Sequence, residues 1–157
     1  MNTDTARTNA EVIHPAERAA HLLVAIGLLI LASYFLRHQT TETGFFTAGF
    51  GGLEMFCLYG PLLFAMLPPL IRVLAGRRNP ARPVEIVSYV FTGLGGLWLL
   101  MRFPFEFGHF ADVLPAGLQF LLAWMTNDIA KIPLVLMVIT APFTAFSTAR
   151  RYLAARR

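Results

Sequence analysis

Long apolar runs separated by short polar connections dominate the sequence. Crossing the hydrocarbon core of a bilayer takes roughly 20 mostly apolar residues. Four runs are close to this length: 19–36, 53–74, 84–101 and 128–149. Pro83 lies just before the third run, where it suits the first turn of a helix. We therefore predict an all-α integral membrane protein with four transmembrane helices, a polar N-terminal segment (1–18) and a basic tail (151–157).

A fifth apolar run, 113–125, lies between the third and fourth predicted spans. It is too short to cross a bilayer, and its length fits an interfacial or re-entrant helix better. We predict a short helix of this kind at the outer face. In the alternative, the run crosses the membrane and the two termini lie on opposite sides.

Composition supports the membrane class. Hydrophobic residues make up 56% of the chain and charged residues 14%, whereas soluble domains have about 25% charged residues. The mean hydropathy is +0.59. The single cysteine, Cys57, excludes an internal disulfide and a paired-cysteine redox motif.

The basic residues are distributed unequally between the two predicted faces. Ten of the 13 Lys and Arg residues flank the spans on the side of the termini, and three lie on the other side: Arg37, Arg102 and Lys131. Cytoplasmic loops carry the excess of basic residues. We therefore expect both termini in the cytoplasm and the protein in a bacterial inner membrane. Because these charges flank apolar runs, we expect the bilayer, and not a nucleic acid, to be their partner.

Small residues recur at spacings of four in the last two spans, which lets membrane helices approach closely. We expect these two spans to form a tight antiparallel pair. The residues are Ser88, Thr92 and Gly96 in the third span, and Thr140, Ala141, Thr144 and Ala145 in the fourth. Pro61 and Pro142 lie deep in their spans and are expected to kink them.

The segment after the third span reads Arg-Phe-Pro-Phe-Glu-Phe-Gly-His-Phe-Ala-Asp over residues 102–112. Phe alternates with Pro104 and Glu106, and the residue before a proline is pushed out of the helical region. We therefore predict extended backbone here, covered by protein. Ten of the 14 Phe residues lie in the predicted outer half. This bias indicates a packed, Phe-rich cap.

Seven ionisable residues lie in or near this cap. They form the candidate functional cluster: Glu54, Arg102, Glu106, His109, Asp112, Asp128 and Lys131. Ionisable groups at membrane depth are usually paired. We expect Arg102 to pair with Glu106 or Glu54, and Lys131 with Asp128. Two interpretations stay open: these pairs fix the cap to the helices, or they line a functional pocket.

The sequence gives little support for bound cofactors. His38, His109 and Asp112 form a weak metal set. His21 has no second intramembrane histidine that could complete a haem site. We predict no cofactor, although haem or quinone would be conceivable ligands. In addition, no nucleophilic side chain lies near a histidine base in the sequence, so the chain does not resemble a hydrolase.

Two functional hypotheses follow. The first is a small transporter-like or accessory membrane subunit, acting as a homo-oligomer or within a membrane complex, with Glu54 as the candidate ion carrier. The second is a membrane redox or lipid-modifying enzyme whose outer cap binds a quinone or lipid. The first implies no enzymatic activity.

Overall fold

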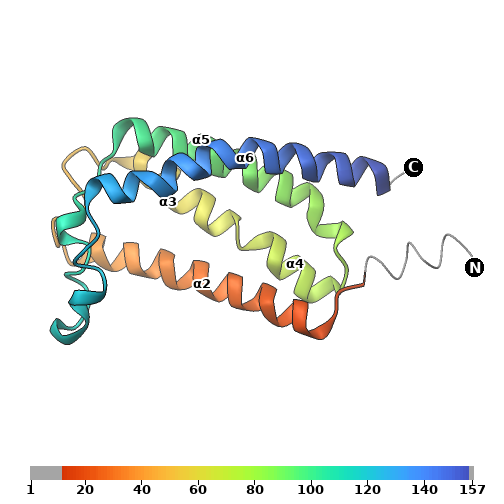
Figure 1. Cartoon of the computed structure of the whole chain (residues 1–157), viewed down its shortest axis with the longest axis horizontal. Helices are drawn as coiled ribbons and strands as arrows, with labels where there is room; N and C mark the ends of the chain where they lie inside the picture. Colours follow the sequence, from red (N-terminus) through yellow and green to blue (C-terminus); the bar gives the residue numbers. More distant parts are fainter. Residues whose placement is uncertain (1–11, 156–157) are drawn as a thin grey trace, which may run out of the picture.

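The computed structural model describes residues 12–155, and most of them are helical (Figure 1). The α-helices are α2 (Pro15–Thr40), α3 (Gly52–Phe64), α4 (Leu67–Ala75), α5 (Arg82–Arg102) and α6 (Asn127–Ala155). Short 3₁₀ helices are η1 (Asn79–Ala81), η2 (Phe107–His109) and η3 (Ala116–Leu121). Residues 1–11 of the predicted polar segment and residues 156–157 of the predicted tail lie outside this range.

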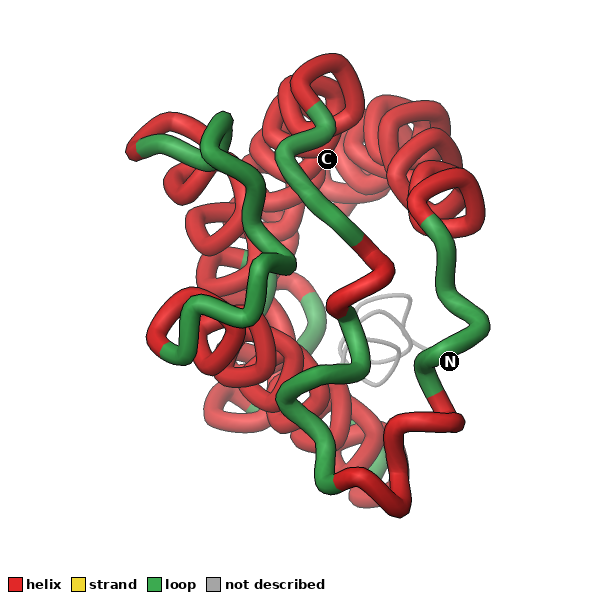
Figure 2. Tube along the Cα trace, turned by 90° about the vertical axis from the view of Figure 1, so that its left-hand side faces the viewer, coloured by secondary structure: helices red, strands yellow, loops and turns green. Residues whose placement is uncertain are grey.

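Four helical stretches of the described chain are long and apolar enough to cross a membrane, with α3 and α4 together making the second. The predicted all-α fold with four spans is therefore confirmed. The helices run up and down, so that α2 begins and α6 ends at the same end of the bundle (Figure 1). We call this the arginine-rich end. The opposite end, which holds residues 41–51 and 103–126, is the aromatic end (Figure 2).

The second span is interrupted between α3 and α4. Pro61 lies inside α3 without ending it, and the break falls at Ala65 and Met66, between α3 and α4. Pro68 and Pro69 explain its position, because neither has the N–H that would bond the carbonyl four residues earlier. In the last span, α6 continues through both Pro133 and Pro142. The expected kinks at Pro61 and Pro142 stay predictions, and the break lies one turn after Pro61.

Helices α5 and α6 pack against each other in antiparallel directions. On α5, Ser88, Gly95 and Gly96 are buried and Thr92 is half-buried. On α6, Ala141, Ala145 and Thr148 are buried. The neighbouring Thr140 is exposed and Thr144 is half-buried, and both donate to carbonyls of their own helix, 2.7 and 2.9 Å away. The alanine face of α6, and not Thr140 and Thr144, therefore forms the close contact.

Ion pairs connect the helices at the arginine-rich end. Arg78 donates two hydrogen bonds to Glu17 on α2, at 3.0 and 2.7 Å. Arg72 on α4 lies 2.5 Å from the Glu85 carboxylate on α5. Two-point Arg–carboxylate contacts fix geometry better than single ones. Since α2 also packs on α4 along this end, α2 is held to the second span there.

The predicted outer helix over 113–125 is shorter than expected. Only Ala116–Leu121 is helical, and it is a 3₁₀ turn and not an α-helix. Pro115 and Gly117 explain the difference, because both residues disfavour a regular α-helix here. Leu118, Phe120, Leu121 and Trp124 of this region are exposed. The segment leaves η2 and returns to the start of α6 at the aromatic end (Figure 2).

Candidate functional site

Phe45 forms the centre of a cap at the aromatic end. Its side chain is 0% exposed, and six aromatic rings surround it at centroid distances of 4.6 to 5.8 Å. These rings belong to Phe35, His38, Phe46, Phe105, Phe107 and Phe110. Edge-to-face and offset contacts at such distances are favourable. The cap therefore packs like the core of a soluble protein, although it lies at the end of a membrane bundle.

Backbone pairing holds the two connecting segments of the cap together. Phe46 and Phe105 form an isolated antiparallel pair, with Glu106 N–H donating to Phe45 at 2.7 Å and Thr47 N–H to Pro104 at 3.1 Å. Residues 104–106 are thus extended, as the alternation of Phe and Pro predicts, but the extended stretch is shorter than expected because Phe103 is left-handed and η2 begins at Phe107. The bonds satisfy backbone groups that would otherwise be unpaired near the bilayer.

Phe103 turns the chain from α5 into the cap. It has φ +38° and ψ 65° and ends α5 by donating its N–H to Leu99. A left-handed residue followed by proline is a common way to stop a helix, although the position usually holds glycine. The Phe103 ring packs on Phe105 and Phe107, and the Lys131 ammonium lies 4.9 Å from its centroid. These contacts compensate for the unfavourable backbone.

His38 connects the end of α2 to the cap. It is 1% exposed; its Nδ1 lies 2.6 Å from the Thr43 hydroxyl and its Nε2 lies 3.1 Å from the Phe110 carbonyl. The Tyr34 hydroxyl donates to the same carbonyl. Because a carbonyl only accepts, the network assigns the proton to Nε2 and leaves Nδ1 to accept from Thr43. Both nitrogens are therefore used within the fold.

The structure does not gather the seven candidate residues around one cavity. Six of them form separate contacts near the surface of the aromatic end. His109 pairs with Asp112 at 2.9 Å, and Lys131 with Asp128 at 3.1 Å. Glu106 accepts from the Asn127 amide at 3.2 and 3.3 Å, and Arg102 is exposed. Within residues 12–155, no three His, Cys, Asp or Glu side chains are placed to hold a metal ion.

Glu54 is the buried member of the set. One carboxylate oxygen accepts from the Trp98 indole at 3.1 Å and the other from the Gly51 N–H at 3.0 Å. Arg102 lies 3.9 Å away, so of the two expected partners of this arginine the structure selects Glu54. The Gly51 bond satisfies a backbone donor just before α3. Glu54 thereby connects the start of α3 to the end of α5.

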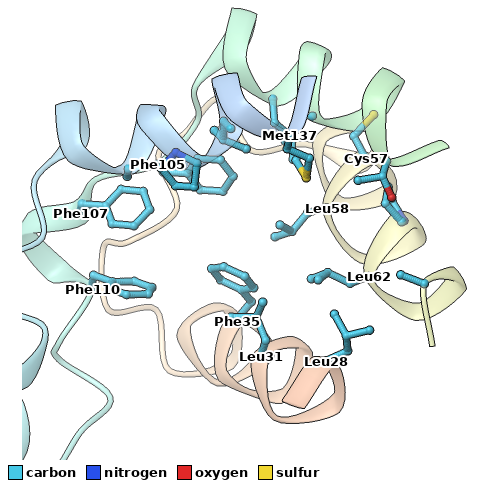
Figure 3. Close-up of a pocket in the computed structure, with 18 of the residues that line it drawn as sticks. Leu28, Leu31, Phe35, Cys57, Leu58, Leu62, Phe105, Phe107, Phe110 and Met137 are labelled. Atoms are coloured by element: carbon cyan, nitrogen blue, oxygen red, sulfur yellow. The ribbon is translucent and has the colours of Figure 1, made fainter. Parts of the chain in front are cut away.

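Beneath the cap lies an apolar cavity of about 460 Å³ (Figure 3). Helices α2, α3, α5 and α6 contribute its walls, and the cap rings close it at the aromatic end. Only Cys57 and Thr92 bring a polar side-chain atom to the lining. The other lining residues are Leu28, Leu31, Phe35, Phe45, Leu58, Pro61, Leu62, Ala65, Gly96, Leu99, Phe105, Phe107, Phe110, Met125, Ala130, Pro133, Leu134 and Met137.

The cavity opens sideways, between α2 and α6. These two helices do not pack along each other. Leu31 of α2 and Pro133 of α6 both line the cavity and are exposed, so they mark its rim. This side of the bundle faces the hydrocarbon if the four helices span a bilayer.

Sequence reasoning missed the cavity, although it predicted the cap that closes it. The lining combines four helices and two connections, and no spacing along the chain reveals that combination. Gly96, which the sequence predicts as a packing residue, also lines the cavity. The excess of Phe near one end was the only signal in the sequence.

The fold defines a multi-pass α-helical membrane protein with a laterally open, apolar cavity. Comparison with known proteins adds no relationship: no family model, curated protein or solved structure matches the chain.

Proposed function

We propose that this protein holds the apolar chain of a membrane lipid in the cavity below the aromatic cap. The observation that carries the proposal is the lining, which is almost free of polar atoms and has its exposed members, Leu31 and Pro133, on α2 and α6. Small-molecule sites have volumes of about 300–1,000 Å³, and the cavity lies in this range at about 460 Å³. An acyl or isoprenoid chain needs no hydrogen-bond partner and suits such a lining.

A quinone ring or a haem fits the lining less well. Quinone carbonyls need donors, and the cavity offers only one hydroxyl and one thiol. Haem needs an axial ligand; the lining contains no histidine, so only the sulfur atoms of Cys57, Met125 and Met137 could serve, and both nitrogens of nearby His38 are already bonded. The lipid-binding form of the second sequence hypothesis is therefore the form that the geometry supports.

The transporter-like hypothesis receives less support. Its candidate carrier, Glu54, does not line the cavity, and Gly51, Trp98 and Arg102 surround its carboxylate. An ion carrier must exchange partners as it loads and unloads. A carboxylate on α3 that is held by the residue before α3 and by two side chains of α5 is better suited to joining those helices.

Retained lipid measures the proposed function directly. Leu31→Trp and Leu134→Trp place large side chains into the cavity, whereas Ile30→Trp and Leu136→Trp place them on exposed faces of the same helices. Each protein is purified in mild detergent and its bound lipid is counted by native mass spectrometry. We expect the wild type and the surface double variant, Ile30→Trp with Leu136→Trp, to retain lipid. The cavity double variant, Leu31→Trp with Leu134→Trp, should lose it. Equal retention by all would contradict the proposal.

We further propose that both termini lie in the cytoplasm of a bacterial cell, with the aromatic end outside. The support is the excess of arginine at the other end. Alkaline phosphatase, which is active only outside the cytoplasm, and green fluorescent protein are each fused to the C-terminus. Fluorescence without phosphatase activity is expected, and the reverse result would overturn the orientation.

A further inference from the structure

Residues 113–126, which we call the 113–126 loop, present a patch of large apolar side chains at the aromatic end. Phe120 is 70% exposed and Trp124 60% exposed, and Leu118 and Leu121 are exposed beside them. A soluble surface rarely carries such a contiguous apolar patch without a partner. In Figure 1 the loop lies at the aromatic end, with its helical turn beyond the end of α2, and returns from there to the start of α6.

The loop satisfies much of its own hydrogen bonding. Backbone N–H groups of Leu114, Leu118, Leu122, Ala123 and Met125 donate to carbonyls three or four residues earlier. The Trp124 indole N–H donates to the Leu121 carbonyl at 2.7 Å, so this ring directs no free donor toward water. Irregular backbone can enter an apolar phase only if its polar groups are paired in this way.

The apolar surface of the loop continues into the cavity. Leu122 and Met125 pack against the buried core below the cap, and Met125 also lines the cavity. The same segment therefore carries the exposed Trp124 and, next to it, the cavity-lining Met125. No polar side chain of the loop other than Gln119 and Thr126 interrupts this surface, and Gln119 donates to the Leu114 carbonyl.

We propose that the 113–126 loop inserts into the lipid layer at the aromatic end and forms the access route by which a lipid chain reaches the cavity. Its partner is the acyl-chain region of the bilayer, which matches both the exposed rings and the internal hydrogen bonding. The access role rests on the proposed lipid-binding function, whereas insertion of the loop does not.

Fluorescence of Trp124 tests the insertion alone. The protein and a Trp124→Phe variant are placed in nanodiscs of plain lipid, or of lipid brominated either near the headgroup end of the chain or near the bilayer centre. The difference between the two proteins isolates Trp124 from Trp98. We expect strong quenching by the lipid brominated near the headgroup and little quenching by acrylamide in water. Quenching by acrylamide and not by bromine would overturn insertion.

Exchange of the retained lipid tests the access route. Phe120 and Trp124 do not line the cavity, so replacing them should slow entry and exit of the chain equally and leave its affinity unchanged. Protein is moved into nanodiscs of deuterated lipid, and mass spectrometry follows the replacement of the light lipid with time. We expect Phe120→Ser with Trp124→Ser to slow exchange by about threefold or more, with the final amount of bound lipid unchanged.

The matched control is Phe143→Ser with Phe146→Ser, which changes two exposed rings on α6 outside the cavity lining. This control should exchange at the wild-type rate. The access route would be overturned if both double variants slowed lipid exchange, or if neither did. If the wild type retains no lipid, the proposed function fails, and the access route fails with it, but bromine quenching still decides whether the loop inserts.

Discussion

The backbone N–H of Glu106 donates a 2.7 Å hydrogen bond to the carbonyl of Phe45. This bond joins the connection between the first two spans to the connection between the last two. It also fixes the Phe45 ring in the middle of the cap, where Phe105 and Phe107, on either side of Glu106, pack against it. One short contact between extended segments thus positions the rings that close the cavity.

Phe45→Ala should destabilise the protein more than any exposed Phe substitution. The ring is fully buried, and removing such a ring costs about 3–5 kcal/mol because the surroundings cannot collapse into the space. Phe143→Ala, at an exposed position on α6, is the control and should cost less than about 1 kcal/mol. Unfolding in mixed micelles measures both. Similar losses would show that the cap is not a packed core.

His38→Ala should lower the free energy of unfolding by about 2 kcal/mol, because the Thr43 hydroxyl loses its buried acceptor and the Phe110 carbonyl loses a donor. Tyr34 still donates to that carbonyl, which limits the loss. His38→Gln keeps a donor and an acceptor and should recover part of the stability. Thr43→Val should cost about 1 kcal/mol in the wild type and less in His38→Ala. Additive losses in this double-mutant cycle would argue against the contact.

The sequence predicts the helices well because bilayer thickness sets the length of an apolar span. It also predicts the extended segment at residues 104–106, since alternation with a proline excludes helix. The arrangement of the helices is harder to predict. Helix α2 is apolar around its whole circumference, so no stripe shows which face contacts protein.

The candidate site shows the same limit. Lys131 pairs with Asp128 as expected because the two are one turn apart on α6. The cavity was not predicted because it depends on how the helices pack. Helix α2 packs against α3 and α4 but not along α6, and this arrangement cannot be read from the sequence. Similarly, Thr140 and Ala141 are adjacent small residues, and only the three-dimensional packing selects Ala141 for burial.

Replacing Glu54 distinguishes the structural role from an ion-carrying one. Glu54→Gln keeps one acceptor oxygen, which can bond the Trp98 indole, and loses the acceptor for the Gly51 N–H. Glu54→Leu removes both acceptors. We expect the melting temperature to fall slightly for Glu54→Gln and substantially for Glu54→Leu. The amount of retained lipid should be unchanged in Glu54→Gln. Proteoliposome flux assays with protons and monovalent cations provide the other readout. Ion flux that Glu54→Gln abolishes without loss of stability would favour the carrier hypothesis.

Gly95 lets α5 approach α3 closely. A Cβ at this position would lie 2.8 Å from the Cys57 carbonyl, which has no intrahelical donor because residue 61 is proline. Gly95→Ala should therefore destabilise the protein by about 1–3 kcal/mol. Gly27→Ala is the matched control, since nothing lies within 4 Å of its Cβ position, and it should stabilise α2 by about 0.5–1 kcal/mol. In thermal unfolding, we expect Gly95→Ala to lower the melting temperature and Gly27→Ala to raise it.

Cys57 provides a natural probe of the cavity, since it is the single cysteine of the chain and lines the wall. In intact membranes we expect slow alkylation by N-ethylmaleimide, which partitions into lipid, and no reaction with a sulfonated thiol reagent, which does not. The reaction is slow because a thiolate is disfavoured among apolar groups. Leu31→Trp with Leu134→Trp should slow it further by filling the space, whereas Ile30→Trp with Leu136→Trp should leave it unchanged. Rapid reaction with the sulfonated reagent would show that water reaches the cavity, which contradicts lateral access from the bilayer.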